Sequence, residues 1–272
     1  MPSISEKRET FRRLHESGCF VIPNPWDIGS TRYLQSLGFK ALATTSAGAA
    51  WAVGCPDGGT PRDVMLAHIR LIVESTDLPV NADFESGFAD NPEGVAESVK
   101  LCVETGVAGL SIEDSTGDPA RPLYDIDVAV ARMKAARAAI DQTGSGVLLV
   151  GRAEGFIRGV PDLDGMIARL QAYSDSGADV LYAPGLTMSE QIASVVRAVA
   201  PKPVNVLMGQ PNPLRVQHLA DLGVRRISVG GSLARAAWGG FMRAAKLIVD
   251  EGSFDGFKDA APSAELNKLF RG

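Results

Sequence analysis

Residues 105–113 read Thr105-Gly106-Val107-Ala108-Gly109-Leu110-Ser111-Ile112-Glu113, and their pattern indicates the fold class. A glycine follows a helical pattern, a nearly continuous apolar run begins at once, and a carboxylate closes the run. Glycine readily takes the left-handed conformation that ends a helix, and an unbroken apolar run is typical of a strand covered on both faces. The stretch therefore predicts a helix joined directly to a buried strand of a parallel sheet.

The same joint recurs along the chain, with glycines at Gly38, Gly177 and Gly223 in equivalent places. Stretches with helical periodicity separate eight short apolar runs, at residues 19–22, 41–45, 80–84, 109–113, 147–152, 180–183, 204–207 and 226–229. Repeated helix–glycine–strand units favour a (β/α)8 barrel over a doubly wound open sheet. We expect a single barrel domain over residues 1–272, with a helical tail from residue 253 that packs on a neighbour.

Composition bounds the class of protein. The 272 residues suit one α/β barrel, and 45% hydrophobic with 22% charged residues is ordinary for a globular enzyme. The formal charge of −5 argues against a nucleic-acid binder. No apolar run approaches the roughly 18 residues of a membrane span, and the polar N-terminus does not resemble a signal peptide. Three scattered cysteines do not form a disulfide framework, so we expect a cytoplasmic protein.

Carboxylates gather where the predicted strands end, which is where barrel enzymes place their chemistry. Asp83 and Glu85 are two apart on one predicted strand, so both should point into the barrel mouth. Glu113 ends the next strand, and Asp57 lies on a loop that can fold over them. Neighbouring carboxylates raise one another's pKa unless a cation joins them. We expect a Mg²⁺ site here, with Mn²⁺ as an alternative, rather than acids that cap helices.

Other residues at the strand ends fit an anionic substrate. Arg152 ends the fifth strand and either clamps a substrate carboxylate or forms a structural ion pair, and we favour substrate contact. Ser46, Ala47 and Gly48 follow the second strand and offer small side chains with free backbone N–H groups. Asn205, on the seventh strand, is a further candidate for substrate binding.

Missing residue types exclude other barrel chemistries. No lysine lies at the C-terminal end of a predicted strand, which disfavours a Schiff-base aldolase. The three histidines fall on helical stretches, which disfavours a histidine-ligated zinc site and a Ser-His-Asp triad.

Three motifs together resemble the isocitrate lyase/phosphoenolpyruvate mutase superfamily. Residues 80–88, VNADFESGF, resemble its D-x-[DE]-[ST]-G-[FY] stretch. Residues 109–114, GLSIED, are similar to its G-x-x-[IL]-E-D strand, and residues 151–154, GRAE, to its [AG]-R-[TA]-[DE] strand. The motifs occur in the expected order and span nearly the whole chain.

This resemblance implies a site and an assembly. It implies Mg²⁺ near Asp83, with Asp57, Glu85 and Glu113 holding the metal's waters. It implies that the metal is chelated by a 2-oxo acid or its enolate, that Arg152 and the Ser46–Ala47 segment contact the substrate's anionic groups, and that Arg152, Ser46 and Glu113 are catalytic. It also implies a homo-oligomer, a dimer or a tetramer, in which subunits exchange the last barrel helix.

The loop at residues 115–125 departs from the best-known members. Lyases that cleave isocitrate or methylisocitrate carry a K-[KR]-C-G-H run after the Glu-Asp pair, and this loop has neither its cysteine nor its histidine. Mutases and phosphonopyruvate hydrolases carry a lysine and a later asparagine there, and this loop has neither. We expect Arg121 and Tyr124, on this loop, to contact the departing group of the substrate, unless they belong to the surface.

The sequence thus predicts a Mg²⁺-dependent C–C lyase that acts on a small 2-oxo or dicarboxylic acid through a metal-bound pyruvate enolate, as in oxaloacetate decarboxylation or a retro-aldol cleavage. One alternative is an enzyme of P–C bonds, of the phosphoenolpyruvate mutase or phosphonopyruvate hydrolase type. A second alternative is a barrel that binds a 2-oxo acid without turnover.

Overall fold

Eight parallel strands form the centre of the computed structural model, which describes residues 2–271. Met1 and Gly272 of the predicted domain lie outside the described residues. The strands are β1 (Phe20–Ile22), β2 (Leu42–Ala43), β3 (Val80–Asp83), β4 (Gly109–Glu113), β5 (Leu148–Arg152), β6 (Val180–Tyr182), β7 (Val204–Leu207) and β8 (Arg226–Ser228). Each lies within the apolar run that predicted it, and the prediction of a (β/α)8 barrel is confirmed.

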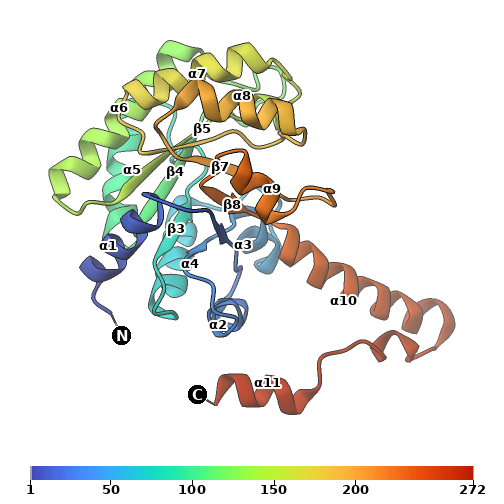
Figure 1. The fold of residues 1–272 in the computed structure, drawn as a ribbon. Helices are drawn as coiled ribbons and strands as arrows, with labels where there is room; N and C mark the ends of the chain where they lie inside the picture. The colour runs from blue at the N-terminus through green and yellow to red at the C-terminus, as the bar shows by residue number, and fades with distance from the viewer. Residues whose placement is uncertain (1, 272) are drawn as a thin grey trace.

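The sheet runs in the order β1-β8-β7-β6-β5-β4-β3-β2. Strands β1 and β8 pair in parallel through Val21 and Ile227, which bends the sheet back on itself. Between β1 and β2 the backbone N–H of Ala43 donates to the carbonyl of Pro23 at 3.0 Å. The sheet is therefore a nearly closed barrel, with helices around it (Figure 1).

Helices connect successive strands and cover the outside of the barrel. They are α1 (Ile4–Leu14), α2 (Ile28–Ser36), α3 (Ser46–Ala52), α4 (Arg62–Glu74), α5 (Pro92–Glu104), α6 (Ile126–Thr143), α7 (Leu163–Asp175), α8 (Ser189–Val199), α9 (Val216–Asp221), α10 (Ser232–Glu251) and α11 (Ser263–Phe270), with 3-10 turns η1 (Gly155–Arg158) and η2 (Asp255–Phe257). Helix α1 precedes the barrel, and its Phe11 is fully buried in one apolar cluster with Ile22 and Leu148. This cluster leaves the other end of the barrel, where the strands end, for the site.

The glycines of the helix–strand joints adopt the predicted conformation. Gly38, Gly106, Gly177 and Gly223 have φ between 82° and 96°. Side chains other than glycine rarely take such angles without strain, so these positions let each helix end and the next strand start within a few residues.

The C-terminal part of the chain leaves the barrel. Helix α10 projects outward and α11 returns toward the barrel (Figure 1), and Ala234 is the buried residue of α10. The ring of Phe270 on α11 comes close to Gly29 of α2. The end of the tail therefore reaches α2 of its own subunit, and packing of the tail on a neighbour stays a prediction. Exchange of the last barrel helix stays a prediction.

Over residues 2–271, the helices are all too short or too polar to cross a bilayer.

Candidate active site

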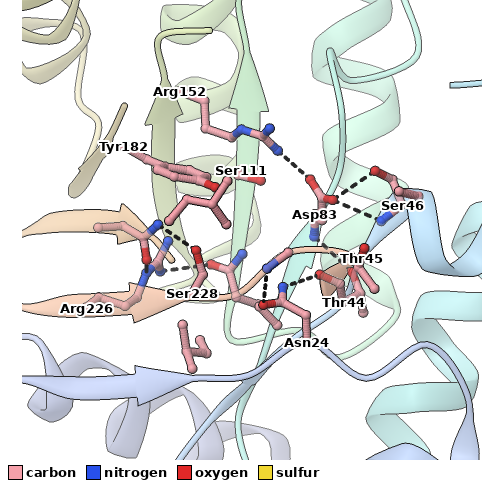
Figure 2. A pocket seen from close by; sticks show the side chains of 18 of the residues that line it. Asn24, Thr44, Thr45, Ser46, Asp83, Ser111, Arg152, Tyr182, Arg226 and Ser228 are labelled. Carbon is pink, nitrogen blue, oxygen red and sulfur yellow. Dashed lines mark hydrogen bonds and ion pairs between the residues drawn. The ribbon is translucent and has the colours of Figure 1, made fainter. Parts of the chain in front are cut away.

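A polar cavity of about 190 Å³ opens at the ends of the strands. Its walls come from nearly every strand, with Thr44 and Ser46 after β2, Asp83 on β3, Arg152 on β5 and Tyr182 on β6 (Figure 2). The inward direction of alternate strand residues brings these side chains together from positions far apart in sequence. We call this space the central cavity.

Asp83 lies at the junction of three elements. Its Oδ2 accepts hydrogen bonds from the backbone N–H and the Oγ of Ser46, both at 2.9 Å. Its Oδ1 accepts one from Nη1 of Arg152 at 2.6 Å, as Figure 2 shows. Its own N–H donates to Oγ1 of Thr44 at 2.9 Å. These bonds fix the orientation of the Asp83 carboxylate at the cavity wall.

The guanidinium of Arg152 contacts three protein carboxylates. Besides Asp83, its guanidinium contacts Oε1 of Glu154 at 2.8 Å and Oε2 of Glu113 at 3.2 Å. It also lies over the ring of Tyr182, 5.0 Å from the centroid. Burial lowers the pKa of Arg152, but the three carboxylates outweigh it and hold that pKa well above its usual value. The positive charge of Arg152 is thus largely committed to the protein.

A second cavity, of about 370 Å³, adjoins the central cavity and shares Ser46, Asp57 and Arg152 with it. Glu85 and Glu113 also line it. We call this space the acidic cavity. Five carboxylates border the two cavities near the mouth (Asp57, Asp83, Glu85, Glu113 and Glu154), and the guanidiniums among them are those of Arg152 and Arg158. Fully ionised, the group would carry an excess of three negative charges.

Burial and this excess of negative charge raise the pKa values of several of the acids. Burial and the charges of Asp83 and Asp57 raise the pKa of Glu85 to about 7. Burial, with Asp83 as the next cause, raises the pKa of Asp57. Burial raises the pKa of Glu113 to about 8, against the opposing charge of Arg152. A cation among these groups would keep them ionised at neutral pH.

The residues fit a hydrated divalent cation better than a fully protein-ligated one. Within residues 2–271, no three His, Cys, Asp or Glu side chains stand close enough to form a direct metal cage. Glu85 lines the acidic cavity, and its Oε1 is nevertheless buried with no hydrogen-bond partner. Mg²⁺ keeps several waters, which carboxylates around it can hold. Asp83 would be its inner ligand, and Asp57, Glu85 and Glu113 would hold its waters.

Glu85 reaches the site by a different route from the predicted one. Strand β3 ends at Asp83, so the two acids do not alternate along one strand. Glu85 has φ 48° and Phe88 has φ 55°, both in the left-handed region. Non-glycine residues in this region cost free energy and cluster at functional sites. A tight turn after β3, rather than strand pleating, directs the Glu85 carboxylate to the acidic cavity.

Four of the predicted site residues lie outside the cavities or are bound within the protein: Gly48, Arg121, Tyr124 and Ser46. Gly48 does not line either cavity: it is buried where a Cβ would collide with Thr45 and Trp26, so it allows close packing of α3. Arg121 is exposed and faces Asp118 at 3.9 Å. The N–H and hydroxyl of Ser46 bind Asp83, so this N–H of the expected cradle is engaged within the protein, and the cradle stays a prediction.

Tyr124 is the other loop residue that the sequence placed at the substrate. Its hydroxyl donates to Oδ1 of Asp90 at 2.7 Å, and its ring lies under Arg132 at 4.1 Å. These contacts hold Tyr124 outside both cavities. Ala47 and Asn205, in contrast, do line the central cavity.

Four functional candidates escaped the sequence reasoning. Glu154 and Tyr182 stood at strand ends, but nothing in the sequence showed that they face Arg152. Arg158 lies on η1, where its guanidinium is 3.4 Å from Glu113, and irregular turns leave no periodic signal. Arg226 opens β8 and lines the floor of the central cavity. Site residues are expected at the ends of barrel strands, and Arg226 stands at the entry of one.

Asp114 anchors the wall behind the site. Its Oδ1 accepts from the N–H of Glu154 at 2.8 Å, and its Oδ2 accepts from the hydroxyl of Tyr173 at 2.6 Å and from Arg169 at 3.1 Å. A buried carboxylate with this many donors is well satisfied. Asp114 therefore positions the Arg152–Glu154 pair rather than facing the substrate.

Comparison with known proteins shows the family of this chain. The family model described as phosphoenolpyruvate phosphomutase matches residues 11–249. The chain belongs to this family. It is an enzyme of the isocitrate lyase/phosphoenolpyruvate mutase superfamily, and the resemblance drawn from the motifs is confirmed.

This member of the phosphoenolpyruvate phosphomutase family is similar to proteins described as lyases, mutases or decarboxylases. A crystal structure from Burkholderia cenocepacia J2315, named only by the general terms lyase/mutase, has a TM-score of 0.95 at 49% identity and covers 99% of this chain and 97% of its own. An oxaloacetate decarboxylase of Pseudomonas putida is 28% identical over 87% of this chain and 83% of its own. The 2-methylisocitrate lyase of Escherichia coli is 33% identical over 60% of this chain and 57% of its own. These names span lyase and mutase chemistry and fix no single reaction.

Proposed function

We propose that this enzyme is a Mg²⁺-dependent C–C lyase that acts on a small 2-oxo or dicarboxylic acid, with decarboxylation of an oxaloacetate-like β-keto acid as the leading reaction. The observation that carries the proposal is the surplus of carboxylates around the small polar cavities, with Oε1 of Glu85 buried and unpaired. The similarity to an oxaloacetate decarboxylase over most of the chain supports the same choice.

The chain's own residues fit such a substrate. The N–H and hydroxyl of Ser46, with Arg152, orient Asp83 at the cavity wall. A divalent cation held there would stabilise the negative charge that develops on the substrate's 2-oxo oxygen. Glu113 is buried beside the acidic cavity and contacts Arg152 and Arg158, which hold its carboxylate where it could bind a water of the metal.

The kinds of residue at the site favour decarboxylation over cleavage of isocitrate-type acids. Neither cavity is lined by a histidine or cysteine among residues 2–271, and Cys55 lines a separate groove beside Trp51. Loss of CO₂ breaks a C–C bond and leaves its electron pair on the enolate, so bond breaking itself needs no side-chain acid. Cleavages that rely on a cysteine proton donor lack that donor here.

A product assay separates this function from its alternatives. The enzyme is incubated with Mg²⁺ and either oxaloacetate or phosphonopyruvate, and pyruvate and phosphate are measured, with enzyme-free samples correcting for spontaneous decarboxylation. We expect pyruvate from oxaloacetate above that background and no phosphate. Release of phosphate from phosphonopyruvate, or its isomerisation to phosphoenolpyruvate, without action on oxaloacetate would establish P–C chemistry instead. Metal-dependent binding of 2-oxo acids without any turnover would establish a binding protein.

We also propose that the enzyme is a homo-oligomer of the cytoplasm. Helix α10 exposes Phe241 and Met242, each 62% accessible, together with other apolar residues on a helix that leaves its own barrel. An exposed apolar helix of this kind is typical of a subunit interface. Cys19, Cys55 and Cys102 are all free thiols, as is usual in a reducing compartment.

A further inference from the structure

Arg226 is a buried cation without a carboxylate partner. It is 3% exposed, and it lies at the floor of the central cavity. Its Nε donates to Oδ1 of Asn205 at 2.8 Å, and its Nη1 donates to Oδ1 of Asn81 at 3.3 Å. Figure 2 shows Arg226 and these hydrogen bonds near Ser228. Both partners are neutral amides. Across residues 2–271, no acidic side chain forms an ion pair with Arg226.

Its situation is the opposite of that of Arg152. Three carboxylates surround Arg152, whereas Arg226 has only dipoles around it. Burial lowers the pKa of Arg226 to about 10, with Arg152 adding to the lowering, which reflects the unfavourable setting of an unpaired charge. Buried charges are normally paired, because removing them from water is costly. Of the two guanidiniums that line the central cavity, Arg226 is the one with charge left for a ligand.

The cavity reaches Arg226 directly from the candidate metal site. Asn81 and Asp83 are alternate residues of β3 that face the barrel interior, and they contact Arg226 and Arg152 respectively. Alternate strand residues are about 6.6 Å apart, so the two guanidiniums sit on successive layers of the barrel. Hydroxyls of Ser111, Tyr182 and Ser228 line the space between them. This is a short polar shaft with a cation at its floor.

We propose that Arg226 binds a carboxylate of the substrate that points down this shaft, and that Arg226 thereby selects dicarboxylic acids over monocarboxylic ones. The inference rests on the proposed function in one respect: the 2-oxo end of the substrate lies at Asp83, so the group at the floor is a second anionic group. Arg226 then recognises this second carboxylate, and Arg152 mainly holds the protein's own acids in place.

The test is a binding measurement with two ligands that differ only in one carboxylate. L-malate and L-lactate are titrated calorimetrically into the Mg²⁺-loaded enzyme, in chloride-free buffer and again with added chloride. Variants Arg226→Gln and Arg226→Lys are compared with wild type, and Arg225→Gln serves as the matched control. Arg225 is the adjacent arginine, and it donates to the carbonyl of Gly18 outside the cavity.

We expect wild type to prefer malate to lactate, and Arg226→Gln to weaken malate binding by roughly 30-fold or more, since a buried charge partner is removed. Lactate affinity should change less than about threefold, Arg226→Lys should keep part of the preference, and Arg225→Gln should behave as wild type. Equal losses for both ligands, or no loss, would overturn the proposal. Chloride that abolishes the preference without affecting lactate would show that a free anion, not a substrate carboxylate, is the partner of Arg226.

A second ligand tests the proposal on the wild-type enzyme, in case the Arg226 variants fail to fold. The 4-amide of malate keeps the shape of the ligand and lacks its second charge, and wild-type enzyme should bind it no better than lactate. Binding of the amide as tightly as malate would sink the proposal without any variant. The outcome is separable from the proposed reaction, because Arg226-dependent binding of malate can be present in a protein that does not decarboxylate oxaloacetate, and the converse can also occur.

Discussion

Nη1 of Arg152 contacts Oδ1 of Asp83 at 2.6 Å and so ties the end of β5 to the end of β3 across the barrel mouth. The same guanidinium holds Glu113 and Glu154, which means that Asp83 can be removed without leaving Arg152 unpaired. This relationship separates the chemistry of Asp83 from the stability of the barrel, and it allows a sharp mutational test.

Asp83→Ala should abolish Mg²⁺-dependent turnover, with a fall of at least about 100-fold, while the thermal unfolding midpoint stays close to wild type. Pyruvate formation from oxaloacetate and circular dichroism would measure the two effects. Asp63→Asn is the control, because that carboxylate is 82% exposed and remote from the cavities. Full metal-dependent turnover in Asp83→Ala would show that the candidate site is misplaced.

Mg²⁺ should stabilise the folded protein through the acidic cavity. At ten times its Kd the metal would add about 1.4 kcal/mol, which corresponds to roughly 3–5 °C in the unfolding midpoint. Differential scanning fluorimetry with Mg²⁺ and with a chelator would measure this shift. An unchanged midpoint over the whole Mg²⁺ range would argue against a metal site.

Glu85→Gln should stabilise the metal-free protein and weaken the stabilisation that Mg²⁺ provides. Without metal it should stabilise the protein at pH 8 by about 1 kcal/mol, because it removes a buried carboxylate whose pKa is raised to about 7. The ionised form of Glu85 lowers stability as pH rises from about 4.5 through 7, and glutamine has no such form. With metal, the variant should show a smaller Mg²⁺ shift than wild type. The control Glu93→Gln, at an exposed position, should neither stabilise the metal-free protein nor reduce the Mg²⁺ shift. Identical behaviour of the two variants would contradict the role given to Glu85.

Acid should destabilise the protein through His15. Its ring lies between Phe11 and Phe20, its Nδ1 is 2.8 Å from the carbonyl of Phe11, and burial with the nearby Arg226 lowers its pKa to about 3. In the unfolded chain His15 binds a proton near pH 6.5, so stability is lost as pH falls below that value. Between pH 7 and pH 5 the loss is about 2 kcal/mol.

Glu85 and Glu113, whose pKa values are raised, add stability as the pH falls over the same range, so the His15 contribution is the difference between wild type and His15→Phe. Urea unfolding of both proteins at the two pH values would measure this difference. The control is His218→Phe, which alters a histidine on α9 at the surface. An undiminished acid effect in His15→Phe would assign it to other groups.

Helix α10 should be part of a subunit interface. Val249 is 84% exposed and Phe241 62%, on a helix of 20 residues that leaves the barrel. We expect a sedimentation mass of two or four times the 28.7 kDa subunit, and a shift toward monomer in the double variant Phe241→Asp, Met242→Asp. Lys246→Gln, on the same helix with its side chain 76% exposed, is the control. Wild-type enzyme that sediments as a monomer would refute the interface.

By itself the sequence determined the barrel, its strands and the family. The apolar runs gave strand positions to within two residues, because a strand buried on both faces must be apolar throughout, and the joint glycines adopt the left-handed φ that ends each helix. The motifs containing Asp83, Glu113 and Arg152 gave the superfamily. These features are local, so a single stretch of chain carries the whole signal.

Only the tertiary structure decided which charges meet. Arg152 looked like a free substrate clamp, but it is shared by three carboxylates from β3, β4 and the turn after β5. Arg226 opens β8, away from the strand ends, yet it lies at the cavity floor with no carboxylate partner among residues 2–271. Pairing in a closed barrel depends on which side chains from distant strands occupy the same layer, and that layer is set by the register and closure of the whole sheet, which no short stretch of sequence records.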